Sequence, residues 1–426
     1  MKALINARIF DFVNYEERGY LLFDQDIAEA GAMEGFPGAE EVIDCKGALV
    51  MPGLANCHTH VYSAFARGMN IPFHPKSFKD ILEQLWWRLD RQLDKEAVYY
   101  SGLAYGADCI RAGVTSIIDH HASGRCIKGA LGTLKSAISD RLGMRGIYCF
   151  ETSDRLPVID CIEENLEFAE QKSEKTGSMF GLHASMSLSD ESLSAISKAL
   201  KGRPIHIHVA ESFDDVADCY SQYHENVVER LDRFGLLNKN SILAHCCHIS
   251  KEEAALIGER GCYIAMNPTS NMNNSVGLPD YGLFKKNGVQ VLLGNDGLGA
   301  NITRDYLNLF FGMKNRLGSP LKFSMEDLAE VICRGYEYMG ASLGIPLGRL
   351  EKGYKADFIV MPYLPPTPMS KDNALGHIIF GVFDCFRPKQ VWIGGQRVLN
   401  DYELEEDLKK ELEEAAAAAA KVWNRL

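Results

Sequence analysis

Polar side chains that could hold a metal ion follow four short apolar runs of the sequence. One run leads into His58-Thr59-His60 and another into His206-Ile207-His208. Residues i and i+2 of an extended strand point to the same side, so each pair of imidazoles faces one point. Two further runs lead into His245 and Asp296. Imidazole and carboxylate groups are common ligands of zinc and similar divalent ions, so the pattern predicts a metal site if the four segments meet.

The residues around the second histidine pair indicate how a metal would be used. His208 lies nearer to the end of its run than His206, so we predict His208 as the ligand and His206 as its support. Glu211 follows three residues later and would stand beside the metal, where it could carry protons. A bound divalent ion lowers the pKa of water to about 7 and makes hydroxide available. Asp296 could both ligate the ion and accept the water proton, so these residues predict hydrolytic chemistry.

The elements that must position these residues alternate between strands and helices from about residue 47 onward. Eight short apolar runs are separated by longer amphipathic segments, of which 78–93 is an example. Eight parallel strands close a (β/α)8 TIM barrel, an α/β fold whose catalytic residues lie at the carboxyl ends of the strands. The predicted barrel strands are 48–54, 114–118, 146–150, 179–183, 204–209, 241–245, 262–266 and 289–293.

Both ends of the chain have the pattern of short β-strands. The predicted strands before the barrel are 3–10, 19–23 and 41–44, and those after it are 355–361, 390–393 and 397–399. The last two flank Gly394-Gly395, which is typical of a hairpin turn. We therefore expect one small β-sandwich built from both termini. The predicted division is 1–53 and 346–403 for the sandwich, 54–345 for the barrel and 404–426 for a C-terminal helix rich in Glu, Lys and Ala.

The overall composition is that of a globular protein. The chain has 426 residues, of which 46% are hydrophobic, and a net charge of −12. An acidic protein is a poor candidate for non-specific binding to nucleic acid or to an anionic membrane. No apolar run approaches the roughly 18 residues of a membrane span, and the first ten residues lack the apolar core of a signal peptide. We expect a cytoplasmic protein with a small-molecule substrate.

Several motifs, taken in order, resemble those of the amidohydrolase superfamily, in its deaminase/chlorohydrolase (ATZ/TRZ-like) branch. The segments that carry this resemblance are 51–60, 208–211, 244–246, 267–271, 294–297 and 348–357. Within the branch, the chain is most similar to the aminohydrolase group called SsnA. The segments that carry this closer resemblance are 65–68, 85–90, 119–123 and 151–155.

The resemblance implies roles for particular residues. It implies a mononuclear site with the metal ligands His58, His60, His208 and Asp296. Glu211 and His245 match the acid–base pair of the family, and His183 matches a position that often touches substrate. Zinc is the first expectation for the metal, with Fe2+ and Mn2+ as alternatives, because three imidazoles and a carboxylate accept several first-row ions. Relatives of this kind imply a homodimer or a larger homo-oligomer.

Four further residues are candidates for substrate contact. Glu151 and Arg155 lie at the end of the third predicted strand, and could either bind a polar substrate or pair with each other in a loop. His121 follows the second strand, where it would face the pocket or cap the mouth of the barrel. Arg67 follows the first strand, where a lid would lie. The tryptophans at 86 and 87 are expected to pack in the core.

The function expected from these observations is that of a metal-dependent aminohydrolase in heterocycle catabolism. Hydroxide would attack a carbon bonded to nitrogen in a purine- or pyrimidine-like ring, and ammonia would leave. A second hypothesis is the ring opening of a cyclic amide, or displacement of another leaving group as in a chlorohydrolase. Ammonia with an intact ring would favour the first hypothesis, and an opened ring the second. A third hypothesis is a non-catalytic barrel that serves as a binding module.

Overall fold

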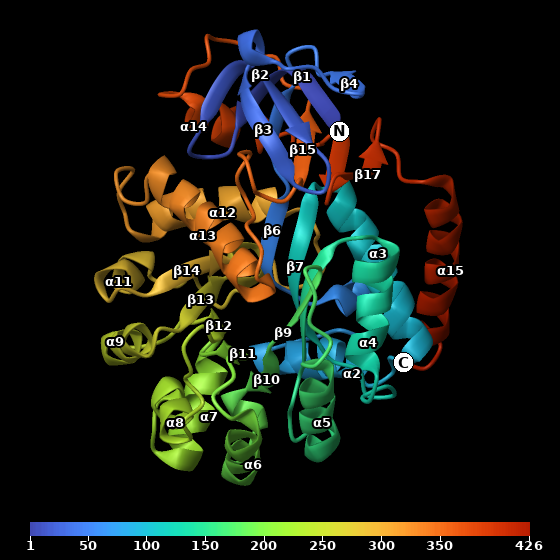
Figure 1. Ribbon diagram of the computed structural model, residues 1–426. Coiled ribbons are helices and arrows are strands. Elements are labelled where there is room, and N and C mark those ends of the chain that lie inside the picture. Colours follow the sequence, from blue (N-terminus) through green and yellow to red (C-terminus); the bar gives the residue numbers. More distant parts are fainter.

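The barrel strands lie side by side around a common centre, with a separate β-sheet at one end (Figure 1). This computed structural model describes all residues from 1 to 426. The barrel strands are β6 (Leu54–Thr59), β7 (Val114–His121), β8 (Arg145–Phe150), β10 (Phe180–Ala184), β11 (Ile205–Val209), β12 (Ile242–His245), β13 (Tyr263–Met266) and β14 (Gln290–Leu293). Neighbouring strands pair in parallel from β6 to β8 and from β10 to β14, and a short β9 (Thr176–Ser178) pairs with β8.

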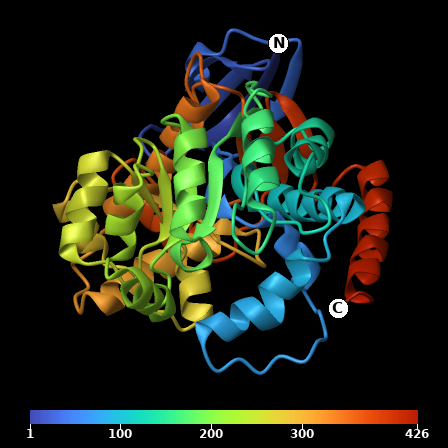
Figure 2. The same cartoon turned by 90° about the horizontal axis from the view of Figure 1, so that it is seen from below.

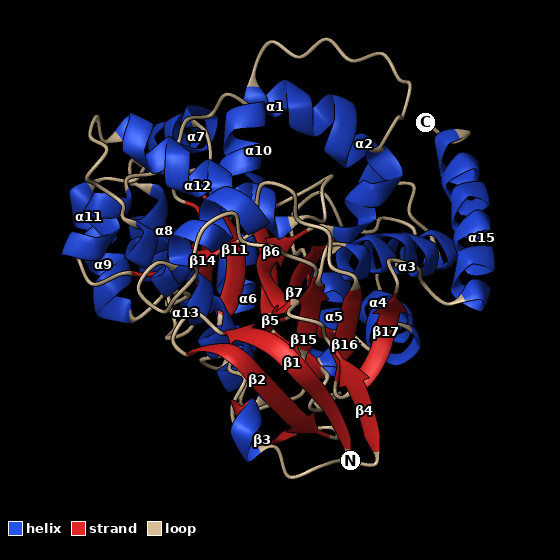
Figure 3. Cartoon of the chain, turned by 90° about the horizontal axis from the view of Figure 1, so that it is seen from above, coloured by secondary structure: helices blue, strands red, loops and turns tan.

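Two short contacts close the barrel. A parallel bridge between Thr59 and Asp296 joins β6 to the end of β14, and another between Thr152 and Leu182 joins the segment after β8 to β10. Helices surround the strands on the outside (Figure 3). The longer ones are α3 (Lys95–Arg111), α5 (Val158–Phe168), α6 (Asp190–Leu200), α7 (Phe213–Tyr223), α9 (Lys251–Arg260), α12 (Ile302–Arg316) and α13 (Met325–Leu343). The shorter ones include α4 (Ala130–Lys135), α8 (Val227–Arg233), α10 (Pro268–Asn273), α11 (Tyr281–Lys286) and α14 (Ala374–His377).

The sheet outside the barrel combines strands from both ends of the chain. Its order is β17-β16-β15-β5-β1-β2-β3, with β4 paired to β1. Its strands are β1 (Lys2–Phe10), β2 (Tyr15–Phe23), β3 (Ile27–Ala32), β4 (Glu41–Asp44), β5 (Leu49–Pro52), β15 (Phe358–Met361), β16 (Gln390–Ile393) and β17 (Gln396–Asn400). The two ends meet where β15 pairs antiparallel with β5. The predicted TIM barrel with a β-sandwich from both termini is confirmed.

One predicted barrel strand belongs to two different sheets in the structure. The run 48–54 was expected to be the first barrel strand, but β5 belongs to the terminal sheet and the barrel begins with β6. Gly53 separates the two, and a Cβ at that position would lie 2.3 Å from the Thr115 side chain, so only glycine fits there. Every residue of both strands is buried. Because burial does not change at the boundary, the sequence pattern does not show where β5 ends and β6 begins.

A helical segment after β6 lies over one side of the barrel mouth. A 3-10 turn, η2 (Val61–Ala66), is followed by a loop and then by α1 (Phe78–Ile81), a π-helical turn η3 (Leu82–Trp86) and α2 (Trp87–Asp90). Figure 2 shows this light-blue helix and its preceding loop at the edge of the molecule. The C-terminal helix α15 (Glu406–Trp423) packs along α3 (Figure 1). None of the helices combines the length and the apolar character that a membrane crossing would need.

Candidate metal centre

Histidines from β6 and β11 point their rings into the barrel mouth. Backbone carbonyls orient two of these rings, since Nδ1 of His60 donates to the carbonyl of His120 (2.6 Å) and Nδ1 of His208 donates to that of His183 (2.8 Å). A neutral imidazole that donates from Nδ1 keeps a free lone pair on Nε2. The two Nε2 atoms lie 3.1 Å apart, so both lone pairs face the same small volume.

Asp296 completes this group from the end of β14. Its Oδ1 lies 3.0 Å from His60 Nε2 and 3.3 Å from His58 Nε2. Burial alone would raise the pKa of Asp296, but the two imidazoles beside it hold that pKa well below its usual range. The carboxylate is therefore ionised. Burial also lowers the pKa of His58 to about 4, which keeps that imidazole neutral and able to act as a ligand.

The residues at this point fit a divalent metal ion. One ligand atom each from His58, His208, His245 and Asp296 lies within 4.8 Å of all the others. His58 Nε2 is buried and has no hydrogen-bond partner, although its other nitrogen lies 2.8 Å from His206. A buried nitrogen without a partner is unfavourable unless a cation or a donor reaches it. Neutral imidazoles with one carboxylate are the donor set that zinc and similar ions prefer.

Glu211 and His245 form a separate pair next to the proposed ligands. His245 Nε2 lies 3.5 Å from Glu211 Oε2, and Asn271 Nδ2 donates to His245 Nδ1 at 3.0 Å. Because Nδ1 accepts that hydrogen bond, the neutral ring carries its hydrogen on Nε2, where it faces Glu211. Burial raises the pKa of Glu211 well above its usual value, and the nearby carboxylate of Asp296 adds to this effect. The pair can therefore hold and donate protons at neutral pH.

The backbone is strained at three of the strand ends that carry these residues. Ala210 after β11, His245 at the end of β12 and Asp296 after β14 have φ values of 45°, 71° and 62°. Residues other than glycine seldom adopt this left-handed conformation, which persists only where the surrounding structure enforces it. At each of these three residues the backbone turns sharply at the barrel mouth, where the polar side chains meet.

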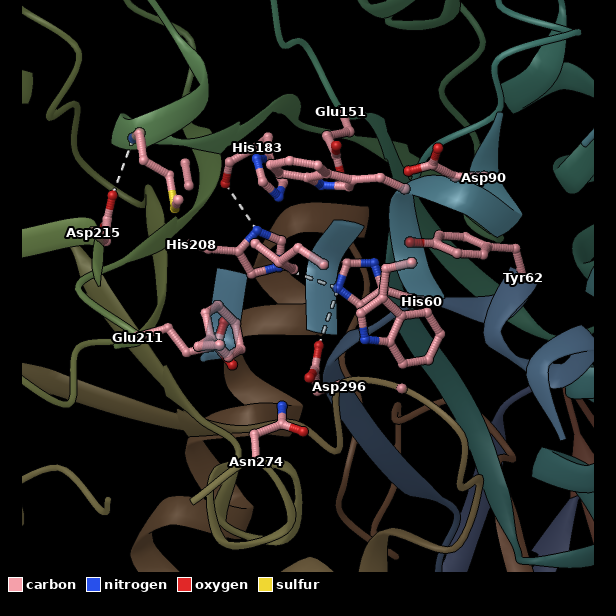
Figure 4. Close-up of a pocket in the computed structure, with 17 residues that line it drawn as sticks. His60, Tyr62, Asp90, Glu151, His183, His208, Glu211, Asp215, Asn274 and Asp296 are labelled. Atoms are coloured by element: carbon pink, nitrogen blue, oxygen red, sulfur yellow. Dashed lines mark hydrogen bonds and ion pairs between the residues drawn. The ribbon is translucent and has the colours of Figure 1, made fainter. Parts of the chain in front are cut away.

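These residues form one side of a pocket at the barrel mouth (Figure 4). Glu211, Asn274 and Asp296 lie on one side of it, Asp90 and Glu151 lie on the other, and His60 and His208 lie between them. The aromatic rings of Tyr62, Trp86 and Trp87 form part of the pocket wall. Both tryptophans, expected to pack in the core, are half-buried and line the pocket, although Trp86 also packs against the hydrophobic core.

The predicted substrate contacts divide into two groups. Glu151 and His183 line the pocket. Arg155 does not, because its guanidinium pairs with Glu151 (2.6 Å) and Asp90 (2.9 Å), and its charge is thus already balanced. The sequence allowed two alternatives for Glu151 and Arg155, contact with a polar substrate or an ion pair with each other, and the structure contains the ion pair.

Neither Arg67, which was a candidate substrate contact, nor His121, for which facing the pocket was one of two alternatives, lines the pocket. Arg67 pairs with Asp108 and donates to the carbonyl of Leu298 on the outside of the barrel. His121 is completely buried, and its Nε2 lies 3.0 Å from Ser123 Oγ. The strand β7 extends through this residue, and neighbouring residues of a strand point to opposite faces. Because His120 points into the barrel, His121 points outward.

Sequence reasoning missed several residues that line the pocket, namely Tyr62, Asp90, Met186, Asp215 and Asn274. Asp90 left a signal, since it follows Trp86 by four residues on an otherwise apolar helix face. A carboxylate at that place is unusual for a helix that only packs. The other four gave no such signal, because Tyr62 and Met186 lie in short 3-10 turns, Asp215 in the first turn of α7 and Asn274 just after α10, and their position at the pocket depends on the folded barrel.

The sequence of this chain is similar to those of known proteins. A sequence model described as the amidohydrolase family matches residues 49–398. A 5-methylthioadenosine/S-adenosylhomocysteine deaminase of Archaeoglobus fulgidus is 30% identical over 366 residues, which cover 80% of this chain and 83% of that protein. A 5'-deoxyadenosine deaminase of Methanococcus maripaludis is 29% identical over 375 residues, which cover 85% of each chain.

Solved structures show the same fold. A crystal structure of an adenosine deaminase from Xanthomonas campestris with bound zinc has a TM-score of 0.85 at 19% identity, and covers 99% of this chain and 98% of that one. The atrazine chlorohydrolase TrzN from Arthrobacter aurescens, complexed with zinc, has a TM-score of 0.81 at 19% identity and covers 98% of this chain and 100% of that one. At this identity the structural likeness concerns the fold alone.

Proposed function

The chain belongs to the amidohydrolase family, and on that premise we propose that it is a metal-dependent deaminase that releases ammonia from a purine-like substrate. One observation carries the proposal most directly. The acid–base pair of Glu211 and His245 lies beside a set of imidazoles and a carboxylate that fits a metal. The curated relatives, deaminases of adenine nucleosides by name, support the purine-like substrate.

The proposed ligands of the metal are His58, His60, His208 and Asp296. We propose zinc, which two structures of the same fold contain, with Fe2+ or Mn2+ as alternatives. When bound, such an ion supplies an activated water for attack on the carbon that bears the amino group. Asp296 is ionised and faces two of the histidines, so it is placed to accept the proton of that water.

The remaining steps belong to the acid–base pair. Burial raises the pKa of Glu211, which favours the protonated carboxyl group, and this group can donate its proton to the ring nitrogen next to the attacked carbon. The Nε2 hydrogen of His245 can stabilise the negative charge that develops on the attacking oxygen. Glu211, now a carboxylate, would take up the proton that Asp296 accepted from the water and pass it to the leaving amino group, which departs as ammonia. The proton of the hydroxyl group formed on the substrate carbon would then pass to Glu211 and restore its protonated form.

The pocket suits a flat, nitrogen-rich molecule that carries hydroxyl groups. Rings such as those of Tyr62 and Trp86, with centroids 6.4 Å apart, supply apolar surface for a heterocycle. At the far side, the carboxylate of Asp90 can accept hydrogen bonds from hydroxyl groups of a sugar. No lysine or arginine lines the pocket, so a phosphorylated substrate would meet no positive charge there. We therefore propose a nucleoside or a base rather than a nucleotide.

Two finer assignments belong to the same proposal. The segments 65–68, 85–90, 119–123 and 151–155 support membership of the SsnA group within the deaminase/chlorohydrolase branch. We also propose a homodimer or larger homo-oligomer, which sedimentation equilibrium of the purified protein would test. A monomer at micromolar concentration would contradict that assignment.

The test of the proposed function is an ammonia-release screen on protein of known metal content. Methylthioadenosine, 5'-deoxyadenosine, adenine, guanine, a pyrimidine nucleoside and a chlorinated triazine make a suitable panel. We expect ammonia and an oxo product with an intact ring from at least one purine. An opened ring would support a cyclic amidohydrolase instead, and chloride release would support a chlorohydrolase. No turnover by fully metal-loaded protein over the whole panel would favour a non-catalytic binding module.

A further inference from the structure

His120 has no role in the proposed reaction, yet it lies in the floor of the barrel among the other histidines. It is part of β7 and is completely buried. Its ring centroid lies 4.7 Å from that of His208, 5.0 Å from that of His206 and 5.4 Å from that of His60. The side chain therefore faces the same interior as the proposed ligands, although it comes from a different strand.

The hydrogen bonds of His120 determine which nitrogen is free. Its Nε2 lies 2.9 Å from the carbonyl oxygen of Leu182 and 3.2 Å from that of His206. A carbonyl oxygen can only accept, so Nε2 must carry the hydrogen and Nδ1 of the neutral ring has a lone pair. Nδ1 is buried and has no hydrogen-bond partner, and Glu151 Oε2 lies 3.9 Å from it. This orphaned acceptor needs a cation or a donor.

Two other imidazoles with a free ring nitrogen lie close to His120. One ring nitrogen each from His60, His120 and His208 lies within 4.8 Å of the other two, in a group that shares only His208 with the group that contains Asp296. The Nδ1 atoms of His60 and His208 donate to carbonyls, so both Nε2 atoms are free to bind. Three imidazole lone pairs around one point make a donor set for first-row divalent ions.

We propose that His120 is a further metal ligand, which with His60 and His208 forms a second position for a zinc-like divalent ion on the β7 side of the pocket floor. This inference rests on the proposed metal site. Each imidazole nitrogen has one lone pair, so His60 and His208 cannot serve two ions at once. The two positions are therefore alternatives for one ion. The position with His120 contains no carboxylate ligand, and it is the weaker of the two.

The test measures metal binding rather than activity. Equilibrium dialysis against Co2+ would compare the wild type, Asp296→Asn, and Asp296→Asn combined with either His120→Gln or His121→Gln. The glutamine amide at position 120 retains a donor toward the carbonyl of Leu182 but lacks a lone pair at the place of Nδ1. His121 is the matched control, because it is the next residue of β7, equally buried, and points the other way.

We expect Asp296→Asn to retain one Co2+ per chain with weaker affinity. Adding His120→Gln should weaken that binding at least about tenfold and change the visible Co2+ spectrum, and adding His121→Gln should change neither. Equal affinity of Asp296→Asn with and without His120→Gln would overturn the proposal. Loss of all Co2+ by a folded Asp296→Asn would do the same.

Two further measurements keep these outcomes interpretable. Thermal unfolding and circular dichroism would show that each variant is folded, and His58→Asn provides a second background if Asp296→Asn is not. His58 belongs to the other group of ligands, so the same comparison applies. A wild type that binds no Co2+ would refute the proposed function together with this inference. A wild type that binds Co2+ while the variants fail the comparison would refute this inference alone.

Discussion

At the scale of single residues, backbone carbonyls decide which nitrogen of each histidine is available. His60, His208 and His120 each donate one ring hydrogen to a carbonyl of the chain. These carbonyls belong to the strands of the barrel and cannot turn away without breaking its pairing. The second nitrogen of each ring is thereby held in place before any metal binds, which reduces the ordering that binding requires.

Glu211→Gln should retain the metal and lose most of the turnover. Glutamine keeps the shape of the side chain but cannot donate and accept a proton as the mechanism requires. We expect kcat to fall by about 10²–10⁴-fold, the range that general acid–base catalysis contributes. Metal analysis of the same preparation is the control. A variant with full metal content and wild-type kcat would show that Glu211 does not carry the proton.

At the scale of elements, the end of α15 and the residues just after it contact the chain on both sides of the helix that forms the pocket wall. Trp423 Nε1 donates to the carbonyl of Phe65 at 2.7 Å, before the loop that leads to α1. Arg425 donates to the carbonyl of Gln92 at 2.9 Å and pairs with Asp94 at 2.7 Å, just after α2. These contacts hold the segment that carries Trp86, Trp87 and Asp90 against the barrel.

Arg425→Ala should therefore weaken substrate binding more than it slows the chemical step. We expect a several-fold rise in KM with kcat within about twofold, because the variant loosens a pocket wall but leaves the acid–base pair in place. Lys410→Ala on the same helix is the control, since Lys410 is exposed and pairs only with Asp407. Steady-state kinetics of both variants decide the matter, and an equal KM for the two would contradict the assigned role.

The end of β11 depends on a buried carboxyl group. Asp215 accepts hydrogen bonds from the backbone N–H of Ala210 (2.9 Å) and Met186 (3.0 Å). Burial raises the pKa of Asp215 to about 6, although these hydrogen bonds oppose the shift. The folded state thus holds the proton more tightly than the unfolded state, whose aspartates titrate near 3.9. The resulting stability is fully present below about pH 4 and is lost as the pH rises through about 6.

Asp215→Asn should remove this pH dependence. A pKa raised by about two units corresponds to about 3 kcal/mol between the two ends of the window. Relative to the wild type, we expect the free energy of unfolding of the variant to rise by about 3 kcal/mol between about pH 4 and about pH 7. Urea unfolding at several pH values measures the difference. Glu252→Gln, at an exposed site in α9, should show a flat difference, and a flat difference for Asp215→Asn as well would refute the assignment.

At the scale of the whole molecule, one buried ion pair joins the barrel to the terminal sheet. Arg145 at the start of β8 binds both carboxylate oxygens of Asp357, at 2.6 and 2.8 Å, just before β15. The two residues are 2% and 5% exposed. Asp357 also accepts the N–H of Gly394 at 2.7 Å, so one carboxylate connects the barrel, β15 and the turn between β16 and β17.

Asp357→Ala should destabilise the protein by about 3–5 kcal/mol, because it leaves a buried guanidinium without its counter-charge. Asp401→Ala removes a partner of Lys389 from an exposed pair in the same sheet domain, and should change stability by no more than about 1 kcal/mol. Chemical unfolding of both variants gives the two free energies. Similar values for the two would mean that the buried pair does not hold the domains together.

Spacing along the chain predicted the part of the site that depends on single strands. The i, i+2 histidine pairs, His245 and Asp296 come from strand ends, and the barrel brings these ends to one mouth. The ligand roles of His58, His60, His208 and Asp296 stay predictions that metal analysis of variants must test. Spacing could not show that β7 continues to His121, because the alternation of a strand defines two faces but does not say which one is inside.

The sequence by itself determined the class of fold, the number of barrel strands and the family, since these follow from periodic apolar runs and from motifs within a few residues of each other. Only the tertiary structure decided that Trp86, Trp87 and Asp90 form a pocket wall, that Arg67 lies outside, and that His120 turns toward the proposed ligands. The reason is physical. Local spacing sets the direction of a side chain relative to its neighbours, whereas the packing of distant segments sets what that side chain faces.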